Sequence, residues 1–69
     1  MKTLHYNVPD LMNRESKTRV LNALDKVQGV QEICIDVVRR TVEVEYNEPA
    51  TPEEIKDTII KAGYPIDPS

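Results

Sequence analysis

Three stretches of alternating apolar and polar residues are the feature that most restricts the fold of this chain. They cover residues 3–8, 30–37 and 41–46, and their period of two is typical of strands that bury one face. A short polar joint separates the second stretch from the third, which predicts a hairpin. A brief last strand is expected over residues 64–67, at a sheet edge because Pro65 cannot donate to a ladder.

Two other stretches have the spacing of amphipathic helices. Apolar side chains recur every three to four residues from about residue 14 to residue 27, and Gly29 is suited to closing this helix. The second helix is predicted to begin after Thr51, a good N-cap residue, with Pro52 in its first turn. Gly63 is expected to end it.

The resulting order, βαββαβ, is that of the ferredoxin-like split βαβ plan. We therefore expect an α+β sandwich, with a four-stranded antiparallel sheet and two helices on one face, in a single domain over residues 1–69. The side chains expected between sheet and helices are Leu4, Tyr6, Val8, Val20, Leu24, Val27, Ile33, Ile35, Val37, Val42, Val44, Ile55, Ile59 and Ile66. The open face is expected to carry His5, Glu32, Cys34, Asp36, Glu43 and Glu45.

Composition narrows the range of partners. The chain has 12 acidic and 9 basic residues, a net charge of -3 and only three aromatic residues, so nucleic acid is not an expected partner. It has no apolar run of membrane-spanning length, and we expect no membrane partner. One cysteine, Cys34, cannot form an internal disulfide, which favours a reducing compartment. We therefore expect a soluble, cytoplasmic protein.

Several short segments together suggest a family. They include the apolar helix positions Val20 and Leu24, the Gly29-Val30 turn, the strand alternations and the segment Ala62-Gly63-Tyr64. With these segments the whole chain resembles the heavy-metal-associated (HMA) domain of small copper chaperones and of metal-transporting ATPase N-terminal modules. The resemblance implies binding or handling of Cu(I) or another heavy metal, and docking on a metal-transporting ATPase domain or another protein.

The first loop departs from the family pattern, Gly-Met-x-Cys-x-x-Cys. Asn13 and Ser16 stand at the two cysteine positions, Leu11 replaces the methionine and Asp10 replaces the glycine. Cu(I) is a soft ion that prefers thiolates, whereas a carboxamide and a hydroxyl are hard, neutral ligands. The sequence therefore predicts a degenerate metal loop with weak or no Cu(I) binding. The alternative function is a protein-interaction or regulatory module that keeps the fold but not metal transfer.

Other side chains near the loop have a structural and a functional interpretation. Asn13 is a strong N-cap candidate that would accept from the backbone of Glu15 or Ser16, leaving Ser16 as an ordinary first-turn residue. Met12 could offer a thioether to Cu(I), but a single methionine more often packs or lies on the surface. The resemblance places Tyr64 beside the metal loop.

His5 and Cys34 are weaker metal candidates on the open face of the sheet. In the expected strand order one strand separates them, so they would lie about ~10 Å apart, too far to share one ion within one chain. Cys34 could instead join two chains under oxidation, which leaves a monomer or a weak homodimer as the expected state.

The first helix has a basic excess that includes Arg14, Lys17 and Arg19. A solvated face is one interpretation of these charges, and an electrostatic docking surface is the other. An enzyme is not expected. Residues 27–30 repeat the Val-Gln-Gly-Val phrase of acylphosphatases, which share the ferredoxin-like plan, but here the phrase closes a helix and no arginine follows it.

Overall fold

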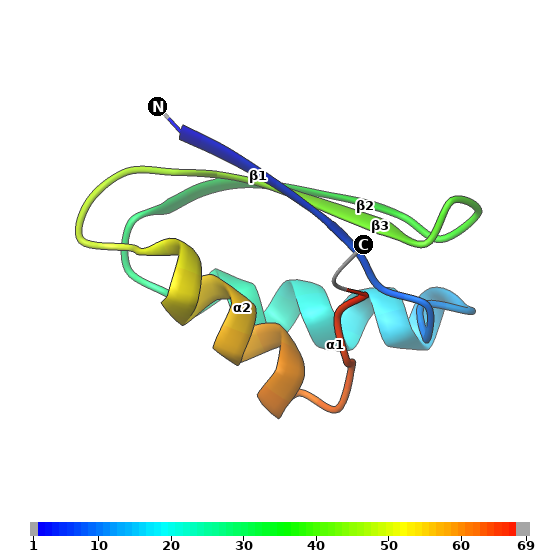
Figure 1. Ribbon diagram of the computed structural model, residues 1–69. Coiled ribbons are helices and arrows are strands. Elements are labelled where there is room, and N and C mark those ends of the chain that lie inside the picture. Colours follow the sequence, from blue (N-terminus) through cyan, green and yellow to red (C-terminus); the bar gives the residue numbers. More distant parts are fainter. Residues whose placement is uncertain (1, 68–69) are drawn as a thin grey trace.

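The computed structural model describes residues 2–67 of the chain. In order, its elements are β1 (Lys2–Asn7), α1 (Arg14–Asp25), β2 (Val30–Asp36), β3 (Thr41–Tyr46) and α2 (Pro52–Lys61). The strands form one layer and both helices cover the same face of it (Figure 1). The predicted α+β class and the placement of both helices on one face are therefore confirmed.

The sheet is antiparallel and has the order β1-β3-β2, so β3 is its central strand. Leu4 and Ile33 both lie opposite Val44, on the side of the helices. In the adjacent row, one residue further along each strand, His5 and Cys34 both lie opposite Glu43. The alternation of apolar and polar residues therefore correctly predicted which residues share a face of the sheet.

The prediction of a fourth strand is wrong for the residues that the structure describes. Its only trace is an isolated bridge in which the Asp67 N–H donates to the Asn7 carbonyl at 2.9 Å. Pro65 has no N–H to offer a ladder. Tyr64 is buried against the core, so this segment packs inward before it reaches β1. The sheet has three strands, and residues 68–69 lie outside the described part.

The first helix ends two residues earlier than predicted, at Asp25, with Lys26 as its C-cap. Gly29 lies in the turn that follows, with φ of +103°. A Cβ at Gly29 would come within 2.4 Å of the Asn47 carbonyl oxygen and 2.8 Å of the Ala50 nitrogen. Because the Asn47 N–H also donates to the Gly29 carbonyl at 2.8 Å, this turn is packed directly on the chain after β3.

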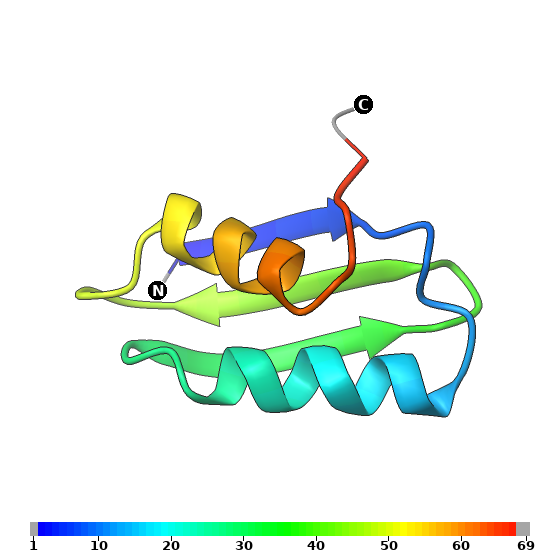
Figure 2. The ribbon, with the colours of Figure 1, turned by 90° about the horizontal axis from the view of Figure 1, so that it is seen from below.

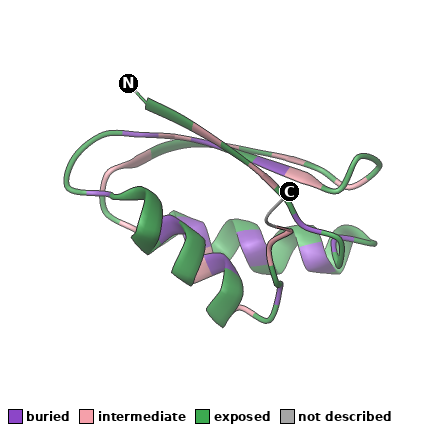
Figure 3. Cartoon of the chain, in the orientation of Figure 1, coloured by how far each residue is buried: buried purple, intermediate pink, exposed green. Residues whose placement is uncertain are grey.

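The core lies where the two helices meet the central strand (Figure 3). The buried side chains are Val8, Leu11, Val20, Leu24, Val42, Val44, Tyr46, Ala50, Ile55, Ile59 and Tyr64. Seven residues expected in the core are only half-buried: Leu4, Tyr6, Val27, Ile33, Ile35, Val37 and Ile66. Most of them lie on the edge strands or just beyond an element, because a chain of 69 residues cannot cover the margins of its own sheet.

β1 and β2 run in the same direction, so the loop after β1 and the turn after β2 lie at the same end of the molecule (Figure 2). The Val8 N–H donates to the Arg40 carbonyl at 2.8 Å and joins the two segments. No helix within residues 2–67 is long and apolar enough to cross a membrane.

Candidate metal loop

The loop between β1 and α1 is fastened to the core by Leu11. The Leu11 side chain has no exposed surface, and the Leu11 backbone N–H donates to the Val8 carbonyl at 3.1 Å. The next residue, Met12, is 63% exposed. Leu11 therefore takes the buried place beneath the loop, and the loop turns outward from there to the start of α1.

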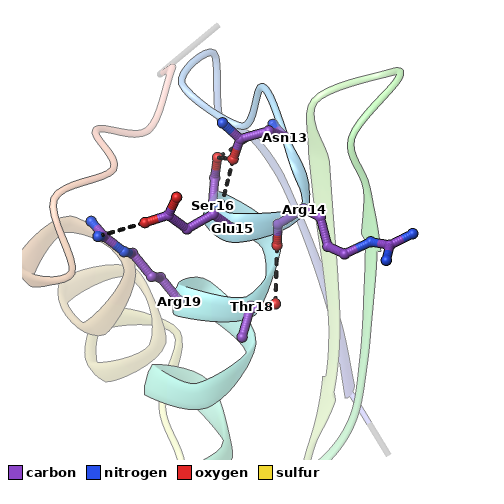
Figure 4. Close-up of polar contacts among 6 residues, drawn as sticks. All are labelled: Asn13, Arg14, Glu15, Ser16, Thr18 and Arg19. Atoms are coloured by element: carbon purple, nitrogen blue, oxygen red, sulfur yellow. Dashed lines mark hydrogen bonds and ion pairs between the residues drawn. The ribbon is translucent and has the colours of Figure 1, made fainter.

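Asn13 and Ser16 form a capping box at the N-terminus of α1 (Figure 4). The Asn13 Oδ1 accepts from the Ser16 N–H at 2.8 Å and from the Ser16 hydroxyl at 2.7 Å. The Asn13 N–H donates to the Ser16 Oγ at 3.4 Å. The N-cap prediction for Asn13 is confirmed. Ser16 is not an ordinary first-turn residue, because it is buried and bonded to the cap in both directions.

The capping box engages both side chains. Asn13 and Ser16 carry neutral polar groups, and their hydrogen bonds satisfy the N-terminal end of α1. Within residues 2–67, no group of three or more His, Cys, Asp or Glu side chains is placed to hold a metal ion. The loop therefore provides α1 with a cap in which both side chains take part.

A shallow cavity of ≈ 280 Å³ opens beside the capping box. Its lining residues are Asp10, Met12, Asn13, Glu15, Ser16, Arg19 and Tyr64. Tyr64 therefore lies next to the loop, as the resemblance implies. Asp10, Asn13 and Glu15 bring oxygen atoms to this lining, as their places in the loop and the first helical turn predict, but their spacing is not that of a regular calcium loop.

Two of the three basic residues predicted to dock a partner, Arg14 and Arg19, extend to different sides of α1 (Figure 4). Arg19 is paired with Glu15 at 2.9 Å, an exposed i,i+4 pair worth little stability. Arg19 lies on the side of α2, whereas Arg14 reaches toward the β2–β3 ribbon (Figure 4). Lys17 is exposed on the same helix.

His5 and Cys34 are both exposed on the open face, with β3 and its Glu43 between them. Their predicted separation by one strand is confirmed, and the structure does not bring them to the loop. The acylphosphatase phrase at residues 27–30 forms the turn between α1 and β2, not the loop after β1.

We expect Asn13→Ala to lower the free energy of unfolding by about 1 kcal/mol, because the helix loses its cap. Urea denaturation measures this change. Asn13→Asp is the matched control, since aspartate caps equally well and its charge is favourable at a helix N-terminus. An aspartate variant as unstable as the alanine variant would contradict the capping role.

Solved structures establish the wider fold. The chain is similar to the CopZ metallochaperone, with 24% identity, a TM-score of 0.90 and coverage of 96% of this chain and 100% of that chain. It is similar to a copper binding domain from HMA7, a P-type ATPase, with 22% identity, a TM-score of 0.90 and coverage of 97% and 92%. It also resembles a chain of the Atx1-Cu(I)-Ccc2a complex, with 19% identity, a TM-score of 0.86 and coverage of 97% and 93%. These likenesses show the ferredoxin-like fold.

Sequence comparison adds a relative and a family. The COP-associated protein of Helicobacter felis is 37% identical over 41 residues, a match that spans 59% of this chain and 62% of that protein. The heavy-metal-associated domain family matches residues 6–65. That range contains the loop, both helices, β2 and β3. The chain therefore belongs to the heavy-metal-associated domain family.

Proposed function

We propose that this chain is a heavy-metal-associated domain of the copper-chaperone type whose loop binds Cu(I) weakly or not at all. The observation that carries the proposal is the capping box between Asn13 and Ser16. To bind copper, the loop would have to give up hydrogen bonds at the helix end and offer oxygen in place of thiolate. Neither change favours a soft, monovalent ion.

The test is a titration with Cu(I) against a chromophoric chelator. We expect the chelator to keep its copper in the presence of this protein. The variants Met12→Leu and Cys34→Ser identify any residual copper binding by sulfur, since Met12 and Cys34 carry the sulfur atoms of residues 2–67. Removal of one equivalent of copper from the chelator, with the strength of a two-thiolate site, would overturn the proposal.

The second candidate is a protein-interaction or regulatory module that keeps the fold and no longer transfers metal. Its support is the exposure of Met12, Arg14 and Lys17. At these positions the loop and the first turns of α1 present an apolar side chain and two charged ones to a partner. The chain is similar to a chain of the Atx1-Cu(I)-Ccc2a complex, and its resemblance to the family implies docking on a metal-transporting ATPase domain. A metal-transporting ATPase domain is accordingly our proposed partner, met through the first loop and α1.

The remaining assignments follow from the same reasoning. HMA metallochaperones are typically non-catalytic, and we propose no enzymatic role for this chain. We place it in the cytoplasm as a monomer or a weak homodimer. The exposed thiol of Cys34 supports a dimer only under oxidising conditions.

A further inference from the structure

The outer edge of β1 has no strand beside it within residues 2–67. β1 pairs with β3 on its inner side. On its outer side the last segment of the described chain reaches it at one place, where the Asp67 N–H donates to the Asn7 carbonyl. Figure 2 shows β1 as the margin of the sheet, with the last segment crossing near its C-terminal end. An open strand edge is a template for pairing with another extended chain.

The backbone groups of Thr3 and His5 face this edge. In an antiparallel strand every second residue directs its N–H and its C=O to the same side. The Asn7 carbonyl accepts from the last segment on the outer side, whereas the Val8 N–H donates to the Arg40 carbonyl on the side of β3. Thr3 and His5 are exposed and have the same direction as Asn7, so each offers one N–H and one C=O to an added strand.

The two edges of the sheet are protected to different degrees. β2 has a register shift between Val30 and Glu32, and it carries the carboxylates of Glu32 and Asp36. β1 pairs with β3 in an unbroken register and contains no proline and no carboxylate. Its one basic side chain belongs to Lys2, at its first position. Bulges, prolines and charges are what keep edge strands from pairing, so β1 is the edge that accepts a further strand.

The distribution of charge decides where two copies of the chain can meet. The carboxylates of the open face, Glu32, Asp36, Glu43 and Glu45, all belong to β2 and β3. Pairing of two copies at β2 would set carboxylates of both chains side by side, which is unfavourable. Pairing at β1 keeps them at least one strand from the joint. Two chains that each have a net charge of -3 therefore meet with the least repulsion at β1.

We propose that two copies of this chain associate by antiparallel pairing of their β1 strands, so that the two sheets become one and all the helices lie on one face of it. The register that uses both open residues places Thr3 of each copy opposite His5 of the other. Each such pair exchanges two N–H···O=C hydrogen bonds. The added strand begins at Lys2, opposite Tyr6, and so stops short of Asn7, where the last segment is bonded.

The side chains are compatible with this register. Leu4 lies opposite Leu4 of the other copy on the helix side, where it is half-buried at the margin of the core. A second chain would cover part of the margin that one chain leaves open. Lys2 of each copy lies opposite Tyr6 of the other, where its ammonium can approach the ring. Few residues take part, so we expect a dissociation constant on the order of 0.1–1 mM.

Sedimentation equilibrium of the whole chain under a reducing agent measures the association. We expect the average mass to rise toward twice that of one chain as the concentration approaches about 1 mM. In the ¹⁵N-labelled chain, dilution should shift the amide signals of Thr3 and His5 most, whereas Ile33 and Ile35 on β2 should change little. Cys34→Ser should associate as the parent does, because the proposed joint does not involve the thiol.

Variants at the edge identify the hydrogen bonds. Thr3→Pro removes an outward N–H from each copy and leaves the bonds to β3 in place, since proline is tolerated where the N–H of an edge strand faces solvent. It is expected to weaken association by about tenfold or more. Thr3→Val is the matched control, because it keeps the N–H, and its effect should be about twofold or less. His5→Pro removes the other outward N–H and repeats the test at a second position.

The mass of a single chain at every concentration would overturn the proposal. So would equal effects of Thr3→Pro and Thr3→Val on a folded chain, or dilution shifts centred on β2 or on the loop after β1. The proposed association does not depend on metal binding. None of these variants changes Asn13 or Ser16, so the Cu(I) titration can succeed or fail independently of this result.

Discussion

A double variant, Asn13→Cys with Ser16→Cys, is expected to bind one Cu(I) at least about a thousandfold more tightly than the parent, a gain of about 4 kcal/mol. The two parent side chains already converge, since the Ser16 Oγ lies 2.7 Å from the Asn13 Oδ1. Thiols at these positions would face each other at a helix N-terminus, which lowers the pKa of a thiol and favours the thiolate that copper binds.

The chelator competition described above measures this gain, and each single cysteine variant is the matched control. One thiolate cannot form the pair, so each single variant should gain much less than the double variant. The double variant also loses the cap, and its free energy of unfolding should fall by about 1–2 kcal/mol. A folded double variant without tight copper binding would mean that Asp10 or Leu11 has changed the loop itself.

Gly29→Ala is expected to lower the free energy of unfolding by about 3–5 kcal/mol, from backbone strain and overpacking together. The φ of +103° disfavours any residue with a side chain. The new Cβ would also lie 2.4 Å from the Asn47 carbonyl oxygen, and a backbone atom cannot move aside cheaply. A domain of this length has only about 3–10 kcal/mol of stability, so the variant should lose a large fraction of it.

Gly63→Ala is the matched control for Gly29→Ala. Gly63 has φ of +100°, yet nothing lies within 4 Å of the position of its Cβ. It therefore suffers the backbone strain alone, and we expect a loss of about 1–2 kcal/mol. Urea denaturation of both variants isolates the contact with Asn47. Equal losses would show that the close approach at Gly29 has no energetic weight.

Periodicity was enough to predict five of the elements and the face each one buries. The alternation around Val42 and Val44 and the helical spacing of Val20 and Leu24 reflect burial against a neighbouring layer, and burial is what a periodic pattern records. The register that separates His5 from Cys34 followed from the same alternation once the strand order was assumed.

The incorrect predictions concern segments outside the helices and strands, where buried residues do not recur at a regular spacing. Ala50 and Tyr64 lie in irregular segments, and their burial depends on how the chain crosses the end of the core. The prediction of a last strand was wrong for two reasons. Tyr64 is buried, which directs this segment inward, and Pro65 has no N–H to donate to a strand ladder.

The candidate site was predictable by position but not by its internal bonding. Comparison with the family pattern located Asn13 and Ser16, and capping preference assigned the role of Asn13. That Ser16 returns a hydrogen bond to the cap depends on a side-chain rotamer.

The hydrogen bond from the Val8 N–H to the Arg40 carbonyl joins two segments that the chain does not connect locally. Val8 is fully buried, so its amide can exchange with solvent deuterium only when the loop and the turn separate. The exchange rate of this one amide therefore reports the free energy of opening at the end of the molecule. A partner that clamps the two segments together would slow it without touching Val8.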